Sequence, residues 1–486
     1  MIYSFGRLAA CFLLIMPWLW SISIQPLPDF LPYVFGYLAF FIFLIFFGFP
    51  SLDEMGRAWI FAALITVFSS IVQFFSIDFF SYQWIFIPKT DFGVAIGFLR
   101  QPNLSATLLC IALVFGIYCI KNNYFRILFA ILIGFGEALF SSRTFIMEIL
   151  FVLMIFCFAG YGVKKHNIFY LGCCFLSYIV FSYIIFVIGR ELEWGYFRNI
   201  FFRFSGGEAC SGRLFLWSNV LELIARHPIT GWVWRGDSLQ YAHYVGDFSG
   251  IRFCEVAGNA HNLFIQSFFY IGIPLSLIIF SLLVLFAVRQ RKIIFGDEKK
   301  FFCWITLFVI FLHSMVEYPM WYAPFQICFI LCVKNIFDLN INKIAVRGLS
   351  ISMTLLIIFM TFDFVKISQA YIPEKYRIVA SKNINEVVDY GKGTLFFQKE
   401  YLYSVLNIID VNDENAKTIY LLSSFLLKYY PQPAVIEKLM ISSVLVKDFE
   451  SFESQRRMYM RAFPKSFEEW RIKHNFETSP PASPAP

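Results

Sequence analysis

The segment NIFYLGCCFLSYIVFSYIIFVIG (residues 167–189) runs for 23 residues without a charged side chain. A helix of about 20 apolar residues crosses the hydrocarbon core of a bilayer, which is about 30 Å thick. Because lipid offers no hydrogen bonds, the backbone of such a segment must satisfy its own polar groups, and a helix does so. The segment therefore predicts a membrane-spanning helix.

Ten more apolar stretches lie on either side of this segment. Together they predict spans at residues 8–25, 33–49, 58–77, 92–120, 127–142, 144–162, 167–189, 263–288, 301–317, 321–337 and 348–366. Pro102 interrupts the stretch 92–120, which is long enough for one span and a re-entrant piece. Charged residues make up 15% of the chain, against about 25% in soluble proteins. We therefore predict an all-α polytopic membrane protein with about eleven transmembrane helices, and a soluble domain is excluded.

Basic residues are unequally divided between the two sides of this bundle. One set of alternate loops holds Arg7, Arg57, Lys121, Arg126, Lys164, Lys165, Arg289, Arg291, Lys292, Lys299, Lys300, Lys343 and Arg347. The other set holds Lys89, Arg100 and Arg143. Because loops rich in Lys and Arg stay in the cytoplasm, the N-terminus is predicted to be cytoplasmic. An odd number of spans then places the long loop and the C-terminal tail on the opposite side.

These boundaries divide the chain into five parts. Transmembrane helices 1–7 occupy residues 1–189, with the first span retained, and helices 8–11 occupy residues 263–366. The large loop lies at 190–262, a helical tail at 367–477, and a Pro-rich end at 478–486 that is too poor in apolar residues to order. In the tail, apolar residues recur at helical spacing in Lys399–Ile409, Asn415–Tyr429 and Ala434–Val446.

Cysteine placement separates the large loop from the rest of the chain. Nine of the eleven cysteines fall inside predicted spans and are expected to pack as small apolar residues. The other two, Cys210 and Cys254, lie in the loop, which is predicted to face an oxidising compartment. We predict that they form a disulfide, with two free thiols as the alternative. No metal-ligand spacing is present, so no metal site is predicted.

The large loop contains seven arginines and no lysine. Arginine is preferred where phosphate or carboxylate is bound by two parallel hydrogen bonds. Beside a membrane, this set suggests a phosphorylated lipid headgroup; the alternative is a solvated loop with matched charges. His261 ends the loop in the sequence NAHNLFIQ, next to Asn262, where a histidine can accept a proton or orient a hydroxyl. The alternative is an interfacial histidine without a catalytic task.

Polar residues gather near three other turns on the same side. Arg143 stands among small polar residues in LFSSRTF, which leaves room for an anion. Arg100, Gln101 and Asn103 surround the Pro102 break, and irregular backbone at that depth is tolerated only when it is buried or lines a cavity. Glu317 precedes another proline in HSMVEYPMWY. We take these residues as candidates for substrate binding.

Several of these segments, in this order, resemble bacterial protein O-oligosaccharyltransferases, in the superfamily of O-antigen ligases and polymerases. They are GFLRQPNLSATLL, SSRT, SGRLFLWSNVLELIARHPITGW, AHN followed by Gly272, and EYPMWYAPF. The family pattern ends in Gly, Thr or Tyr where this chain has Leu275. The resemblance covers residues 90–340, and more loosely the tail through YMRAFPKSFEEW (459–470).

This resemblance implies an inverting, metal-independent glycosyltransferase of the bacterial inner membrane with its active site in the periplasm. The implied donor is an oligosaccharide on undecaprenyl pyrophosphate, and the acceptor is a Ser or Thr hydroxyl of an exported protein such as pilin. By position, Arg143 and Arg213 would hold the pyrophosphate, and His261 would contact the acceptor or act as the base.

Other classes remain open at this point. An O-antigen ligase or polymerase uses the same lipid-linked donor, but the QPN and EYP elements favour the protein transferase. A transporter is also polytopic, yet no internal repeat is visible in the sequence. No phosphate-binding glycine loop or nucleotide fingerprint appears, which is consistent with a lipid-linked donor. No nucleic acid partner is expected.

Overall fold

The computed structural model describes residues 2–20, 22–77, 90–158, 165–194, 197–201, 210, 212–339, 341–372, 377 and 384–474. These residues form helices, turns and loops, without a strand. The basic residues Lys89, Lys164 and Arg203 and the Pro-rich end 478–486 lie outside the described ranges. The chain divides into two compact units, one of residues 1–207 and 283–362 and the other of residues 208–282 and 363–486.

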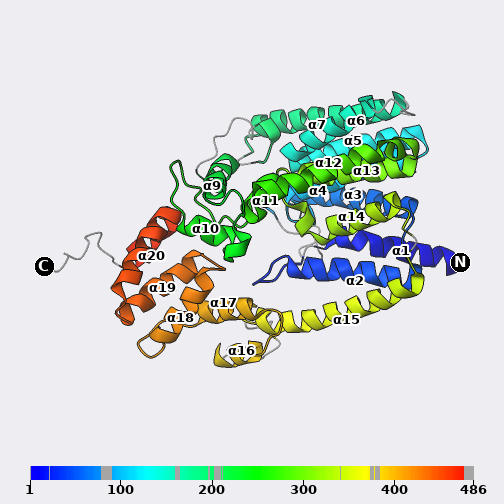
Figure 1. Ribbon diagram of the computed structural model, residues 1–486. Coiled ribbons are helices and arrows are strands. Elements are labelled where there is room, and N and C mark those ends of the chain that lie inside the picture. Colours follow the sequence, from blue (N-terminus) through cyan, green and yellow to red (C-terminus); the bar gives the residue numbers. More distant parts are fainter. Residues whose placement is uncertain are drawn as a thin grey trace. The chain divides into compact units, whose positions relative to one another are not determined.

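The first unit is a bundle of apolar helices (Figure 1). It contains α1 (Ile2–Leu19), α2 (Phe30–Phe47), α3 (Leu52–Phe74), α4 (Pro102–Cys119), α5 (Asn123–Phe140), α6 (Arg143–Phe158), α7 (Lys165–Glu191), the end of α12 (Ile273–Gly296), α13 (Glu298–His313), η3 (Pro319–Trp321), α14 (Ala323–Ile336) and most of α15 (Lys343–Ser368). Helix α4 is the most deeply buried and packs against α3, α5, α6 and α13. The bundle therefore has its core around α4.

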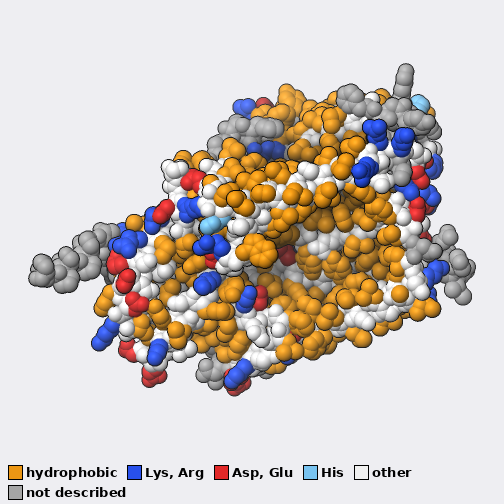
Figure 2. Space-filling model, viewed as in Figure 1, with side chains coloured by type: hydrophobic (Ala, Val, Ile, Leu, Met, Phe, Trp, Pro, Cys, Tyr) orange, Lys and Arg blue, Asp and Glu red, His pale blue; other side chains and the backbone are white. Residues whose placement is uncertain are grey.

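Among the described residues, seven helices are long and apolar enough to cross a membrane. They are Phe30–Phe47, Leu52–Phe74, Pro102–Cys119, Asn123–Phe140, His166–Glu191, Ile273–Lys292 and Lys343–Ser368. The other four predicted spans coincide with α1, α6, α13 and α14, which are shorter or have shorter apolar parts. A polytopic membrane protein is thus supported, and the count of eleven spans stays a prediction. Hydrophobic side chains cover much of the surface in Figure 2, as lipid contact requires.

The predicted break in the stretch 92–120 lies at Pro102, where the helix begins. Residues 90–101 are irregular, and polar side chains satisfy their backbone. Gln73 Oε1 accepts hydrogen bonds from the amides of Ile96 (3.0 Å) and Gly97 (2.8 Å), and Ser105 Oγ donates to Ile96 O (2.9 Å). The irregular segment is therefore held by neighbouring helices, as backbone at this depth must be.

The predicted span 263–288 is divided into two helices, α11 (Leu263–Ile271) and α12. Gly272 between them has φ +81°, and a Cβ there would lie 2.1 Å from Ile229 O. The prediction of one helix was wrong because a contact 43 residues away in sequence, invisible to apolar periodicity, fixes the break at this glycine.

The second unit joins the large loop to the tail. It contains α9 (Arg213–Arg226), η2 (Val233–Arg235), α10 (Leu239–Val245), α11, α16 (Ile384–Gly391), α17 (Gln398–Ile408), α18 (Ala416–Leu427), α19 (Pro433–Leu445), α20 (Phe449–Ala462) and α21 (Pro464–Lys473). Helices α17–α21 pack one on the next, and α17, α18 and α19 confirm the three predicted tail helices.

Contacts between loop and tail centre on α10. Tyr244 lies in the core of the tail helices, and its hydroxyl donates to Gln455 Oε1 (3.0 Å). Arg461 of α20 forms an ion pair with Asp247. The tail therefore supports the loop from which candidate site residues project.

Candidate active site

Three segments selected from the sequence meet in the helix bundle at Asn103. This residue lies in the first turn of α4, and its Oδ1 accepts a hydrogen bond from Ser142 Oγ (2.9 Å). Its Nδ2 donates to Glu317 Oε1 (3.4 Å). All three side chains are buried. Asn103 therefore ties the α5–α6 turn to the turn before η3, and both Asn103 and Glu317 act first as positioning residues.

The α5–α6 turn presents Arg143. Ser141 ends α5 in the left-handed region (φ 52°), and its Oγ lies 3.0 Å from both Ala138 O and Arg198 O. Arg143 is the first residue of α6, and its side chain is exposed. A buried, hydrogen-bonded turn thus holds an exposed arginine, which is a suitable arrangement for binding an anion.

Arg100 and Gln101 lie in the irregular segment before α4. Arg100 is exposed and has φ 56°. Non-glycine residues with positive φ are uncommon and often occur at functional sites. Burial raises the pKa of Asp29, and the charge of Arg100 partly offsets that rise. Gln101 Oε1 is buried and has no hydrogen-bond partner within the described residues.

Asn103 also contacts a buried polar cluster, of which only His313, in the segment HSMVEYPMWY, was noticed in the sequence. Thr107 Oγ1 lies 3.1 Å from Asn103 O and 2.6 Å from Glu148 Oε1, and it is hydrogen-bonded to His313 Nδ1. Glu137 of α5 is also fully buried. An acidic residue inside a predicted span is a functional candidate by default. Glu137 and Glu148 are both acidic residues inside predicted spans, so the sequence already contained this indication.

The loop brings His261 and Arg213 into one environment in the second unit. Burial, and secondly the positive charge of Arg213, lower the pKa of His261 to about 4. Its imidazole is therefore neutral at pH 7, and one ring nitrogen is able to accept a proton. Arg213 is the first residue of α9, where the helix dipole also favours an anion.

The backbone around His261 is fixed by several hydrogen bonds. His261 N donates to Asn259 Oδ1 (2.6 Å), and Ala260 N donates to Gln266 Oε1 (2.6 Å). Asn262 Oδ1 caps α11 by accepting from the amides of Phe264 and Ile265. Asn262, a candidate for substrate binding, thus has a positioning role in this structure. His261 itself has φ 51°.

Two other arginines of the loop, Arg226 and Arg252, bind backbone carbonyls. Arg252 donates to the carbonyls of Gly246 (2.7 Å), Tyr244 (2.9 Å) and His243, and Arg226 donates to the Asp247 carbonyl. For these two arginines, backbone packing accounts for the guanidinium without a bound anion. Within the described ranges, no three His, Cys, Asp or Glu side chains gather in a way that suits a metal ion.

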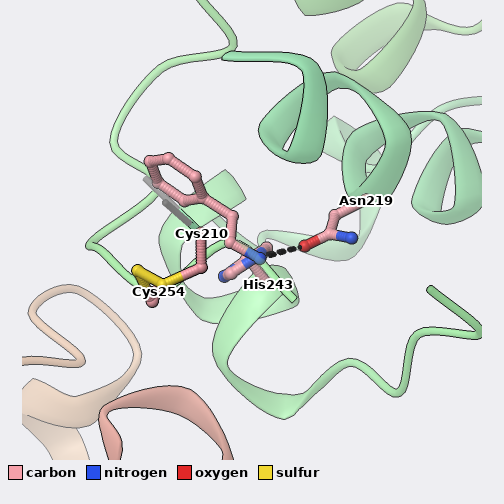
Figure 3. The surroundings of a disulfide bond; sticks show 5 residues. Cys210, Asn219, His243 and Cys254 are labelled. Carbon is pink, nitrogen blue, oxygen red and sulfur yellow. Dashed lines mark hydrogen bonds between the residues drawn. A yellow bond between two sulfur atoms is a disulfide. The ribbon is translucent and has the colours of Figure 1, made fainter. Parts of the chain in front are cut away.

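Cys210 and Cys254 form a disulfide, with their Cα atoms 5.5 Å apart (Figure 3). Beside it, Asn219 of α9 is hydrogen-bonded to His243 of α10 (3.1 Å), and Asn219 Oδ1 also accepts from Phe253 N (2.7 Å). The disulfide and Asn219 thus attach the segment before His261 to the loop helices.

Replacing Cys210 with serine should lower the free energy of unfolding of this unit by about 4 kcal/mol in the chain-entropy model. The bond closes a loop with a sequence separation of 44 residues. Thermal unfolding in detergent, with and without reductant, measures the loss. Cys157→Ser, at a free and exposed cysteine, is the control. An unchanged melting temperature of the wild type in reductant would contradict the prediction.

Replacing Asn103 with aspartate should lower activity about tenfold, because it places a second carboxylate beside Glu317 and removes the amide donor. The reciprocal variant Asn103→Asp with Glu317→Gln restores one donor and one carboxylate, so it should recover most of the rate. Asn335→Asp, at an amide bonded within α14, controls for the charge. Equal losses of activity in the single and double variants would show that the hydrogen bond between residues 103 and 317 does not contribute to activity.

The bundle-side and loop-side candidates belong to different compact units. Asn103, Arg143 and Glu317 lie in the first unit, and Arg213 and His261 in the second. Their meeting in one cavity, expected from the resemblance, stays a prediction.

Comparisons with known proteins match both parts of the chain. Residues 128–280 match the family model described as O-Antigen ligase, and residues 301–475 match the model described as virulence factor membrane-bound polymerase, C-terminal. The chain is 25% identical over 281 residues to the ComP-specific O-oligosaccharyltransferase of Acinetobacter baylyi (strain ATCC 33305 / BD413 / ADP1). This alignment covers 56% of the chain and 48% of the relative, so the chain spans about half of that protein's length. No solved structure matches the chain.

Proposed function

Because this chain belongs to the O-antigen ligase superfamily, we propose that it transfers an oligosaccharide from undecaprenyl pyrophosphate to Ser or Thr hydroxyls of an exported protein such as pilin. The proposed site lies on the periplasmic face of the bacterial inner membrane. Support comes from the name of the A. baylyi relative, which is an O-oligosaccharyltransferase. The QPN and EYP segments of this chain resemble the same group of protein transferases.

The observation that carries this proposal is the pairing of a neutral His261 with Arg213. Transfer to a hydroxyl needs a proton acceptor, because an alcohol is a weak nucleophile at neutral pH. It also needs cations for the pyrophosphate that leaves, because negative charge develops there. A neutral imidazole beside a guanidinium supplies both requirements.

In the proposed reaction the acceptor oxygen attacks the anomeric carbon from the face opposite the pyrophosphate. The carbon–oxygen bond to the pyrophosphate breaks, and its electron pair stays on the leaving group. The hydroxyl proton passes to His261, while Arg213 and Arg143 bind the pyrophosphate oxygens. Asn103, Asn262 and Glu317 hold their turns in place, and Arg100 and Gln101, next to Asn103 in the sequence, are proposed to contact the substrate. All of these roles follow from residue chemistry and require no cofactor.

A second candidate is glycan polymerisation or ligation to a lipid. It is favoured by the match of residues 301–475 to a model of polymerase C-termini. The donor would be the same, but the acceptor would be another lipid-linked sugar. Arg213 and His261 would have the same tasks in either reaction.

Mass spectrometry of exported proteins, with and without the intact chain, separates these functions. Loss of O-linked glycan from protein, with lipopolysaccharide unchanged, is the expected result. A change in lipopolysaccharide length or O-antigen attachment, with protein glycans intact, would replace the proposal by the second candidate. A His261→Asn strain should reproduce the deletion, because its chain keeps the fold but lacks the proposed base.

A further inference from the structure

The connection between α9 and α10 exposes a set of large apolar side chains. Ile229, Val233 and Trp234 are 73%, 45% and 80% exposed, and residues 229–234 are called the apolar tip here. Large apolar side chains grouped in this way at a surface usually mark a contact with another apolar phase or molecule. None of the proposed catalytic steps uses these residues.

The apolar tip is fixed to the junction between α11 and α12. Ile273 N donates to Pro228 O (2.8 Å), and Trp232 N donates to Phe269 O (2.8 Å). The Trp232 and Phe269 rings stack with centroids 5.6 Å apart.

Two glycines bring these backbones into contact. A Cβ at Gly231 would lie 2.4 Å from Tyr270 O, and one at Gly272 would lie 2.1 Å from Ile229 O. The tip therefore keeps a constant position relative to residue 273. All of these contacts lie within the second unit.

Residue 273 is where a candidate membrane span begins. Ile273–Lys292 has 20 residues and is almost entirely unburied by protein, as a helix facing lipid would be. A helix of this length rises about 30 Å, which matches the hydrocarbon core. A span with these limits places its first residue at the boundary between hydrocarbon and headgroups, and the tip, bonded to that residue, at the same depth.

We propose that the apolar tip inserts Ile229, Val233 and Trp234 into the headgroup boundary of the bilayer. Tryptophan is the side chain enriched at that depth, because its ring is apolar and its N–H remains hydrated. Arg235 follows directly, with its guanidinium 5.8 Å from the Trp232 ring centroid, at a level where lipid phosphates are available. The tip anchors the loop to the membrane independently of the span itself.

Site-specific photocross-linking tests this contact on the full chain. A benzophenone amino acid at position 234, in nanodiscs of phosphatidylethanolamine and phosphatidylglycerol, should form lipid adducts on irradiation. Position 278 on α12 is the positive control, since Ile278 is exposed on the span. Position 251 is the comparison site, because Ile251 is also exposed, but its carbonyl accepts a hydrogen bond from Asn219, about two turns before the end of α9. Adduct yield at 234 should approach that at 278 and exceed that at 251.

Quenching of tryptophan fluorescence by brominated lipids gives an independent measurement. Trp234→Phe should lower the quenched fraction relative to wild type, because the removed indole is among those nearest the lipid. Lipid adducts at 278 without adducts at 234 would overturn the proposal. Cross-linking of position 234 to a second copy of the chain would also overturn it, by assigning the tip to a protein interface.

Discussion

Replacing Arg213 with lysine should lower the rate of glycan transfer by about 10²- to 10³-fold, the usual effect of removing one preorganised donor from a developing negative charge. Lysine keeps the charge but replaces the planar fork of a guanidinium by a single ammonium. A loss of transfer rate in Arg213→Lys would therefore come from the lost guanidinium geometry and not from a lost charge. Single-turnover rates with saturating lipid-linked donor measure the effect.

The same substitution separates two roles of Arg213. Its charge is the second cause, after burial, of the lowered pKa of His261. Arg213→Lys retains that charge, so the acid limb of the pH–rate profile should stay in place. Arg213→Gln removes the charge, so the acid limb should move upward, towards the ordinary value of about 6.5.

The controls for Arg213→Lys are Arg→Lys substitutions on α9 and in the first unit. Arg226→Lys changes the last residue of α9, whose guanidinium binds a backbone carbonyl. Arg143→Lys should resemble Arg213→Lys, and Arg57→Lys, at an exposed surface pair with Asp53, should be near silent. Normal transfer in both Arg143→Lys and Arg213→Lys would exclude the proposed pyrophosphate site.

Apolar periodicity predicted the helices well where they are long or amphipathic. The three tail helices whose limits were predicted, α17, α18 and α19, begin and end within about two residues of those limits. The break at Gly272 was not predictable, because it depends on a contact with Ile229 that composition does not encode. Tertiary contacts of this kind override local preference.

The sequence singled out candidate residues one by one, and the structure adds the contacts that each of them makes. Polar residues near prolines drew attention to Asn103 and Glu317, and the structure shows them hydrogen-bonded. These bonds also hold the turns that carry them, and the predicted substrate contacts stay a prediction. Arg252 had the same sequence signal as Arg213, yet it binds three carbonyls. Burial and partners, which distinguish these arginines, are properties of the fold.

Glu148 was not selected from the sequence, although the structure places it in a polar cluster. It lies in an apolar run with no proline or polar neighbour, so attention to turns passed over it. In the fold it contacts Thr107 and lies 3.6 Å from His313 Nδ1. A search for every acidic residue inside a span, independent of turns, would have found this cluster.

Replacing His261 with alanine should lower turnover by about 10²- to 10⁴-fold while donor affinity is largely retained, as expected for loss of a general base. His261 has a left-handed backbone, so strain must be separated from chemistry. Asparagine tolerates that conformation, and a similar loss in His261→Asn would therefore report the missing base. His474→Gln, at an exposed position in the tail, is the control.

The pH dependence tests the protonation state that this role requires. Because the pKa of His261 is lowered to about 4, the base is available above that pH, and the rate should fall only as the pH approaches 4. If His261 instead bound pyrophosphate as an imidazolium, activity would rise towards acid and His261→Ala would lose donor affinity. The free energy of unfolding should also fall towards acid pH. Between about pH 6.5 and 4 the unfolded chain binds more protons than the folded chain, because His261 is then protonated mainly in the unfolded state. The stabilising contribution of the neutral imidazole is therefore lost as the pH falls through that window. His261→Asn should abolish this part of the acid destabilisation. For the rate, wild-type turnover in both His261→Ala and His261→Asn would remove His261 from the mechanism.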